Sequence, residues 1–203
     1  MSKTYTNKRL YTLYEEELNE LTYTPTGLFD KLVHNLSRKF ALTIDLKYTI
    51  SVPVSEFLRG ELICEDVSEL IEKPFTQKNL ISILLDDFLY QAKHSKNLYE
   101  LYRKLHSGIQ QPIEIYHYRG EREILHINNE VQRKKVIDCT IKRKKALRLE
   151  VILNDLASLE PEMTFSVNDI IEFLYRDFIQ QYKNGNLTNV IENILKRLAS
   201  CET

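Results

Sequence analysis

The sequence contains no tryptophan, and only five glycines and five prolines occur among its 203 residues. Residues that bend or loosen the chain are therefore rare, which argues against a fold built from many tight turns and favours long helices. The chain is long enough to bury a proper core, in one large domain or in two small ones. We therefore expect a mainly α fold with little β structure.

Cysteines and long apolar runs are also scarce. The three cysteines, Cys64, Cys139 and Cys201, lie far apart with no metal-ligand spacing, and their odd number argues against a disulfide framework. No apolar run approaches the roughly 18 residues of a membrane span, and the polar start of the chain lacks the form of an export signal. We expect an intracellular protein with no membrane partner, no metal and no cofactor.

Neither sign of charge dominates, because 28 lysines and arginines stand against 29 acidic residues, for a net charge of −1. This balance alone gives no support to nucleic-acid binding, but affinity for phosphate depends on where the cations lie. One stretch is strongly basic. Between residues 133 and 145 the single acid Asp138 stands among seven cations, namely Arg133, Lys134, Lys135, Lys142, Arg143, Lys144 and Lys145.

An internal repeat organises the chain. Residues 75–93 align with residues 165–183 at a constant offset of 90, with seven identical pairs. These pairs are Phe75/Phe165, Ile81/Ile171, Leu84/Leu174, Asp87/Asp177, Phe88/Phe178, Gln91/Gln181 and Lys93/Lys183. In both copies apolar residues recur at steps of three and four, and Thr76 or Ser166 stands just ahead as a helix N-cap. Each copy therefore predicts a long helix with a marked start.

A second helix and a strand precede the capped helix in each copy. The apolar pattern of the upstream helices is Val54, Phe57, Leu58, Leu62 and Ile63 in the first copy and Leu147, Leu149, Ile152, Leu153 and Leu156 in the second. These helices should end near Pro74 and Pro161, because proline disfavours helical geometry in the residue before it. Ahead of them, residues 46–53 and 137–142 alternate with period two, which predicts strands.

The rest of the chain is less regular. Residues 7–21 and 26–39 predict two N-terminal helices, residues 112–127 a β-hairpin around Arg119-Gly120-Glu121, and residues 97–106 and 187–199 further helices. We divide the chain into an N-terminal helical extension (1–40), a first repeat unit (41–107), a hairpin and basic connector (108–135) and a second repeat unit (136–203).

The order strand, helix, N-capped helix, with a Thr-Ile-Ser-Val-Pro strand, resembles the ribbon-helix-helix family of DNA-binding regulators. The resemblance covers about 46–93 and 137–183. It implies a tandem pseudo-dimer in a single chain, whose two strands pair into an antiparallel ribbon that enters the major groove. A natural tandem of this kind, with a composition rich in Tyr, Ile and Lys, is similar to regulators of crenarchaeal viruses. The expected function is therefore sequence-specific binding of double-stranded DNA in transcription regulation, in a host cytoplasm if the protein is viral.

The resemblance also implies which residues contact DNA. The polar face of the ribbon would carry Lys47, Thr49, Ser51, Asp138, Thr140 and Lys142. Lysine, hydroxyl and carboxylate groups can all meet base edges in the major groove. Arg143 and Lys144 extend the basic stretch beside the second strand, and Thr76 and Ser166 mark the helix N-termini at which the family anchors phosphates. Because the two strands differ, the DNA site should be asymmetric.

The two other classes of function are an enzyme and a non-catalytic interaction or assembly protein. An enzyme is not expected, because the five histidines occur singly and the glycines form no phosphate-binding loop. A non-catalytic interaction or structural assembly protein is the main alternative, with the basic stretch as a solubilising surface. Binding that weakens steeply with salt separates the two possibilities. We also expect the N-terminal helices to let neighbouring molecules pack along DNA, so that the protein would be a partner of itself.

Overall fold

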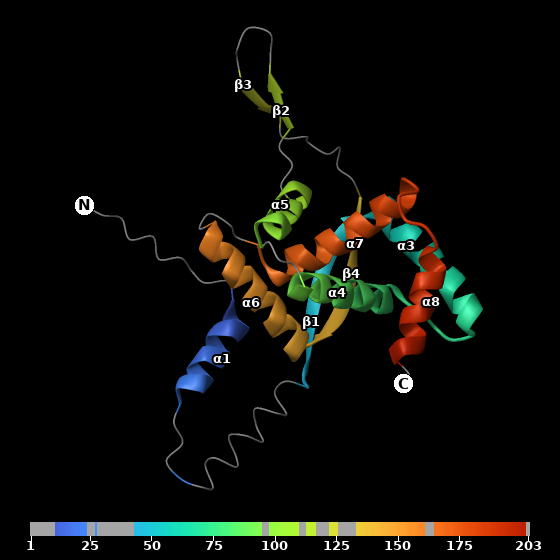
Figure 1. The fold of residues 1–203 in the computed structure, drawn as a ribbon. Helices are drawn as coiled ribbons and strands as arrows, with labels where there is room; N and C mark the ends of the chain where they lie inside the picture. Colours follow the sequence, from blue (N-terminus) through green and yellow to red (C-terminus); the bar gives the residue numbers. More distant parts are fainter. Residues whose placement is uncertain are drawn as a thin grey trace. The chain divides into compact units, whose positions relative to one another are not determined.

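The computed structural model describes residues 11–23, 27, 43–94, 98–109, 113–116, 122–125, 133–160 and 165–201. The described helices, labelled in Figure 1, are α1 (Thr12–Thr22), α3 (Val54–Ile71), α4 (Gln77–His94), α5 (Leu98–Ile109), α6 (Arg143–Leu159), α7 (Val167–Lys183) and α8 (Val190–Cys201). The strands are β1 (Asp45–Pro53), β2 (Ile113–Tyr116), β3 (Arg122–Leu125) and β4 (Lys134–Lys142). The predicted mainly α composition with short β structure is confirmed.

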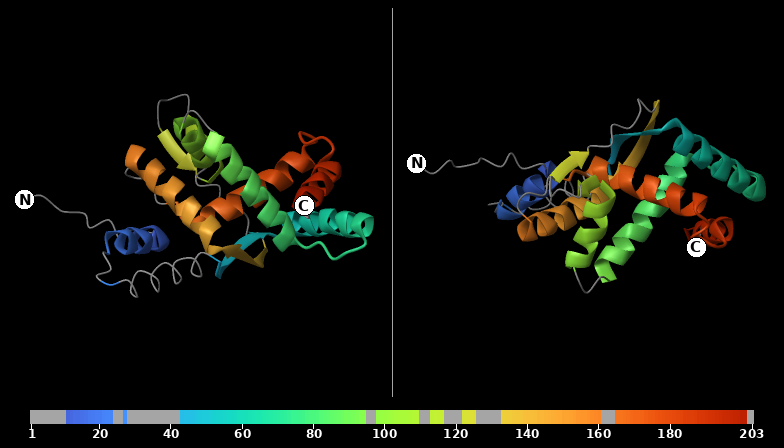
Figure 2. Two further views of the ribbon diagram at one scale, coloured as in Figure 1. Left: turned by 60° about the horizontal axis from the view of Figure 1, so that its bottom comes forward. Right: turned by 90° about the horizontal axis from the view of Figure 1, so that it is seen from above.

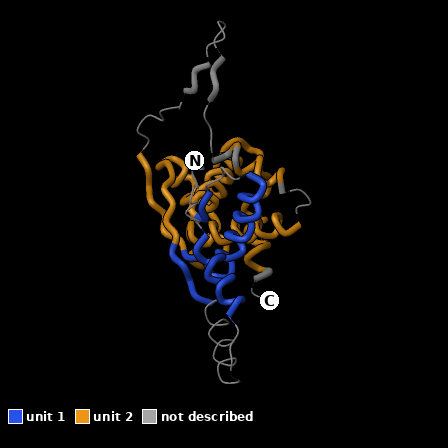
Figure 3. The backbone as a smooth tube through the Cα atoms, turned by 90° about the vertical axis from the view of Figure 1, so that its left-hand side faces the viewer, with its two compact units in different colours: residues 1–47, 140–167 blue, residues 48–139, 168–203 orange. Residues whose placement is uncertain are grey.

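The chain forms two compact units, shown in separate colours in Figure 3. Unit 1 comprises residues 1–47 and 140–167, and unit 2 comprises residues 48–139 and 168–203. The boundary between the units crosses both β1 and β4. The units therefore do not coincide with the segments 1–40, 41–107, 108–135 and 136–203, whose role as successive parts of the chain stays a prediction.

β1 and β4 are paired in a two-stranded sheet, although they are about ninety residues apart in the sequence. In unit 1 the backbone N–H of Arg143 donates to the carbonyl of Ile44 at 2.7 Å. In unit 2 the N–H of Val54 donates to the carbonyl of Arg133 at 2.9 Å. Along β1 from Ile44 to Val54, the bonded partner moves from Arg143 back to Arg133. The two strands therefore run antiparallel, as the resemblance implies. β4 begins at Lys134, three residues before the predicted strand.

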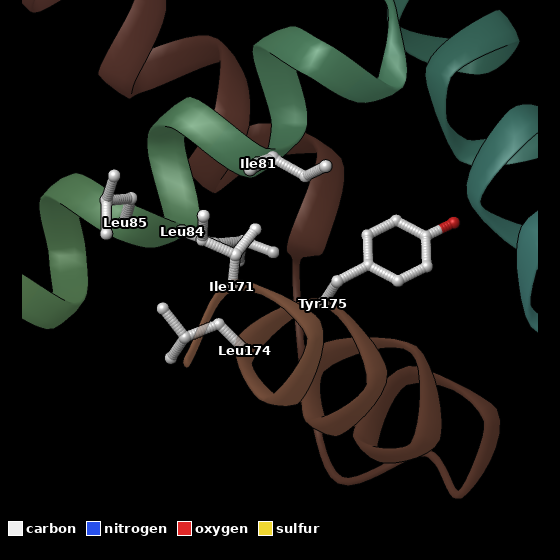
Figure 4. Close-up of a pocket in the computed structure, with 6 residues that line it drawn as sticks. All are labelled: Ile81, Leu84, Leu85, Ile171, Leu174 and Tyr175. Atoms are coloured by element: carbon white, nitrogen blue, oxygen red, sulfur yellow. The ribbon is translucent and has the colours of Figure 1, made fainter. Parts of the chain in front are cut away.

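α4 and α7 begin directly after Thr76 and Ser166, as expected from their N-cap positions. Figure 4 shows how they meet in unit 2, where side chains of both helices line a small pocket. The lining residues are Ile81, Leu84 and Leu85 from α4 and Ile171, Leu174 and Tyr175 from α7. Each α4 residue has its repeat equivalent, at the offset of 90, on α7. The pocket is therefore lined by three positions of the first repeat and by their equivalents in the second.

One of these three pairs is unlike, because Tyr175 has Leu85 as its repeat equivalent. Tyr175 is fully buried, and its hydroxyl donates to Gln77 Oε1 at 2.7 Å and approaches the carbonyl of Glu56 at 3.3 Å. Burial raises the pKa of Tyr175 well above its usual range, so the hydroxyl stays protonated. Gly60 of α3 leaves the room that the hydroxyl occupies.

Glu56 is buried in unit 2, with 5% of its surface exposed. Its carboxylate accepts hydrogen bonds from Arg176 Nε and from Gln180 Nε2, each at 3.0 Å. A buried carboxylate is tolerated only where such partners replace water. The buried face of α3 therefore includes charged and glycine positions, Glu56 and Gly60, besides Ile63, Cys64 and Val67.

The helix that the apolar pattern predicts is present as α3, but the pattern coincides only in part with the buried face. Ile63 is buried as expected, but Val54, Leu58 and Leu62 are 44%, 56% and 52% exposed. α3 packs against α4 and α8 through its other side. The helix ends at Ile71, before Pro74 as predicted, with Glu72 in the left-handed conformation. In α6 the prediction is closer, since Leu149, Leu153 and Leu156 are buried.

In unit 1, α1 packs against α6 (Figures 1 and 2). Glu150 of α6 is 5% exposed, and its carboxylate accepts the backbone N–H of Tyr14, near the start of α1, at 2.9 Å. A carboxylate at the N-terminus of a helix accepts hydrogen bonds from free backbone N–H groups and interacts favourably with the positive end of the helix dipole. α1 confirms the helix predicted at 7–21 over most of its length, and residues 7–10 lie outside the described residues. Of the second helix, predicted at 26–39, residues 26 and 28–39 also lie outside them.

The predicted hairpin is confirmed by β2 and β3, which pair antiparallel with Ile113 opposite Leu125 and Tyr116 opposite Arg122. The predicted turn at Arg119-Gly120-Glu121 lies outside the described residues. α5 and α8 confirm the helices expected at 97–106 and 187–199, with bounds shifted by a few residues.

Candidate nucleic-acid interface

One face of each paired strand is exposed and polar, and the other is buried. On β1, Lys47 and Thr49 are exposed and Ser51 is half-buried, whereas Ile50 and Val52 are buried. The period-two pattern therefore predicts the faces of β1 correctly.

β4 follows the same rule. Asp138, Thr140 and Lys142 are exposed, and Ile137, Cys139 and Ile141 are at most 6% exposed. Burial and Asp138 raise the pKa of the Cys139 thiol to about 11, with Lys78 opposing the shift, so that this cysteine is a neutral packing residue. The six candidate base-contacting residues thus lie on the accessible faces of the two strands.

Two of these side chains already bind carboxylates. Thr49 Oγ1 donates to Asp138 Oδ1 across the strands at 2.9 Å. Lys142 Nζ lies 3.0 Å from Asp45 Oδ1, and both side chains of this ion pair are more than half exposed. Exposed pairs of this kind contribute roughly 0–1 kcal/mol, so a DNA phosphate or base edge can compete for the lysine.

Sequence reasoning missed an apolar residue on the outer face of β4. Val136 is 55% exposed and lies two residues from Asp138, hence on the same side of the strand. Its neighbour Lys135 holds its ammonium 5.5 Å from the ring centre of Phe57. Extending the alternation backward from Ile137 would have found Val136. The predicted strand starts at Ile137 and therefore leaves Val136 out.

Arg143 and Lys144, the first residues of α6, differ in their accessibility. The Arg143 side chain is 12% exposed, and its Nη1 pairs with Glu16 Oε2 of α1 at 3.0 Å. Its Nε is buried and has no hydrogen-bond partner among the described residues. Lys144 is exposed. The structure therefore leaves Lys144 on the accessible surface and places Arg143 against α1.

The two helix N-termini that are predicted to bind phosphates differ in the exposure of their first residues, Thr76 and Ser166. Thr76 is exposed, and its backbone N–H and hydroxyl both donate to Asn79 Oδ1, at 2.9 and 2.6 Å. The Asn79 side chain thus reaches back to the cap residue, as in a capping box. Ser166 is half-buried at the start of α7. Phosphate binding at both termini stays a prediction.

A second, larger groove lies in unit 2, lined by α4, α7 and α8, with a volume of about 520 Å³. Its walls are mainly apolar, and Asp87 of α4 forms an ion pair there with Arg197 of α8. Burial raises the pKa of Asp87, and Arg197 opposes the shift. Over the described part of the chain, no group of three or more His, Cys, Asp or Glu side chains is placed to hold a metal ion.

Comparison with known proteins returned no matching family, no matching curated protein and no matching solved structure. Among the described helices, none is long and apolar enough to cross a membrane. The features that bear on function are the paired strands β1 and β4 and the charges on and beside them.

Proposed function

We propose that this protein is a sequence-specific regulator of transcription that reads the major groove of double-stranded DNA with the paired strands β1 and β4. The observation that carries the proposal is the pairing of two short strands whose outer faces are polar and whose inner faces are buried. A two-stranded β-ribbon fits the major groove of B-DNA, where each base pair presents a distinct pattern of donors and acceptors.

The chemistry of the outer faces fits base readout. Lys47 and Lys142 offer donors for guanine O6 and N7, and Thr140 can donate or accept. Asp138 receives a hydrogen bond from Thr49 and keeps further acceptor capacity for cytosine N4. Val136 adds an apolar contact of the kind that recognises the thymine methyl group.

The local charge supports the same reading. Arg133, Lys134 and Lys135 at one end of β4 and Lys142 and Lys144 at the other are all exposed. Cations that flank a strand can neutralise the phosphates on both sides of a groove. The chain's net charge of −1 does not oppose this, because phosphate binding depends on the local field.

The two strands carry unlike residues on their outer faces, so the proposed DNA site is asymmetric. Lys47 and Thr49 lie on β1, whereas Asp138 and Thr140 lie on β4. A symmetric dimer presents the same residues twice and reads a palindrome. A single chain with two different strands has no such requirement.

The test is a titration of labelled random duplexes and of a genomic fragment pool at two salt concentrations. The variant Lys47→Ala, Thr49→Ala, Thr140→Ala, Lys142→Ala is compared with the wild type, and Lys183→Ala with Lys196→Ala serves as a control for lost charge. We expect the wild type and the control to select one sequence with a clear salt dependence, and the ribbon variant to lose that selection while staying folded.

Selection that survives in the ribbon variant, or no binding by any of the three proteins, would overturn the proposal. The second candidate function is protein assembly, which the exposed residues Val54, Leu58 and Leu62 of α3 favour. Association through apolar surfaces is far less sensitive to salt than binding to phosphates. The two salt concentrations therefore separate the candidates.

A further inference from the structure

The outward face of α3 has two halves of different chemistry. The first half carries the exposed apolar residues Val54, Leu58 and Leu62. The second half carries exposed acids, among them Glu65 and Glu69, and no basic residue lies in the last turn. Acidic groups near the C-terminal end of a helix interact unfavourably with the negative end of its dipole, so a cation from another molecule would be stabilising there.

The outward face of α6 has the reverse arrangement. Its first turn contains cations and no acid, and Lys144 and Arg148 are exposed. Farther along the same face lie Val151 and Leu159, which are 37% and 50% exposed. Cations near the N-terminal end of a helix also oppose the dipole, so this end would accept acids from a partner.

The two faces match when the helices run antiparallel. The residues of α3 at steps of four, four, three and four are Val54, Leu58, Leu62, Glu65 and Glu69. Read backward from Leu159, α6 presents at the same steps Leu159, Asp155, Val151, Arg148 and Lys144. Residues three and four apart share one face of a helix. Two of the resulting pairs are apolar, Val54 with Leu159 and Leu62 with Val151. Two are oppositely charged, Glu65 with Arg148 and Glu69 with Lys144. The one mismatch is Leu58 opposite Asp155.

We propose that α3 of one molecule docks antiparallel on α6 of a second copy of this chain, with Leu62 against Val151 and Glu65 against Arg148. A symmetric contact between two α3 helices fits less well. An antiparallel pair of α3 helices would place Glu65 against Leu58 and Glu69 against Val54, and a parallel pair would place acids against acids. The docking joins two different surfaces and is therefore heterologous, so that each molecule keeps a second surface for a further neighbour.

One helix-to-helix contact is small, and its affinity in solution should be low. Stable interfaces bury at least ~1,200 Å² in total, so we expect a dissociation constant of roughly 0.1–1 mM for this contact. Two protein molecules bound at neighbouring positions on one DNA molecule have a high effective concentration relative to each other, which would allow this weak contact to form. This alignment along DNA depends on the proposed function, whereas the docking itself does not.

The test uses sedimentation velocity of the full chain at low salt without DNA. Glu65→Arg and Arg148→Glu are each expected to weaken self-association by about fivefold or more, because an attraction is replaced by a repulsion. Glu192→Arg on α8 and Arg103→Glu on α5 make the same changes of charge at exposed positions elsewhere and should leave association unchanged. Lys144 is left intact in all variants, so that a predicted DNA contact is not altered.

The decisive measurement is rescue by exchange of the charges. Both the double variant Glu65→Arg, Arg148→Glu and an equimolar mixture of the two single variants should associate within about twofold of the wild type. Absence of wild-type association at ~1 mM, reversals that behave like their controls, or failure of the double variant to recover would each overturn the docking. Failure to bind DNA while rescue succeeds would overturn only the proposed function.

Discussion

Gly60 provides a stringent test of how α3 and α7 pack in unit 2. A Cβ atom added at Gly60 would overlap the Tyr175 hydroxyl oxygen and lie 3.0 Å from Tyr175 Cζ and 3.4 Å from Gln77 Oε1. Tyr175 is fully buried and cannot swing into solvent. The substitution Gly60→Ala therefore forces a rigid aromatic side chain to move.

The expected size follows from three contributions. Alanine in a helix interior is favoured over glycine by about 1 kcal/mol. Overpacking a filled core costs about 1–3 kcal/mol, and losing the bond from the Tyr175 hydroxyl to Gln77 costs about 1 kcal/mol more. We predict that Gly60→Ala lowers the free energy of unfolding by about 1–3 kcal/mol.

Urea unfolding followed by circular dichroism measures this change, and Tyr175→Phe supplies the matched background. Without the hydroxyl oxygen the main overlap is gone, so the cost of Gly60→Ala should fall by about 1–2 kcal/mol. An equal cost in both backgrounds, or a Gly60→Ala protein as stable as the wild type, would refute the packing of Gly60 against Tyr175.

Two further predictions concern the contact of α1 with α6. Glu16→Gln releases Arg143 from its ion pair, and because Glu16 is 57% exposed the stability should change by less than about 1 kcal/mol. If the released guanidinium reaches a phosphate, the salt dependence of DNA affinity should steepen by up to about 0.9 in slope, and an unchanged slope would rule out that role. Burial raises the pKa of Glu150, with the N–H groups of Tyr14 and Leu13 opposing the shift. Because the folded-state pKa is raised, Glu150 contributes most to stability below its unfolded pKa and loses that contribution as the pH rises through the folded pKa. In thermal melts, the stability of the wild type relative to Glu150→Gln should therefore fall from acid to neutral pH. A stability difference that is flat or grows with pH would contradict this account.

Local periodicity predicts much of this fold. The alternation in β1 and β4 identified the buried face, because one side of a two-stranded ribbon must cover a core. The starts of α4 and α7 followed from Thr76 and Ser166, each with its first apolar residues placed at helical spacing. These features depend on residues that are close in the sequence.

Features that depend on distant partners were not predictable in this way. α3 buries Glu56 because Arg176 and Gln180, about 120 residues later, supply its hydrogen bonds. It buries Gly60 because Tyr175 needs that space. The apolar character of Leu58 and Leu62 therefore does not show on its own that both are exposed.

In the candidate site, too, features set by the local sequence pattern were predictable, and features set by tertiary contacts were not. Period two placed Lys47, Thr140 and Lys142 on accessible faces, because exposure along a strand is set by its own alternation. Arg143 looked equally available in the sequence, but Glu16 lies 127 residues away and pairs with it. A basic stretch shows that cations are near one another, and only tertiary structure shows which of them are already paired.

The most direct test of the central claim is methylation interference on a DNA fragment that the protein selects. Dimethyl sulfate marks guanine N7 in the major groove and adenine N3 in the minor groove, so one experiment reports on both grooves. Binding through β1 and β4 predicts that methyl groups at guanine N7 in the site abolish binding and that Lys142→Ala relieves this at one end of the site. Interference from adenine N3 alone, or none at guanine N7, would contradict the claim that the ribbon reads the major groove.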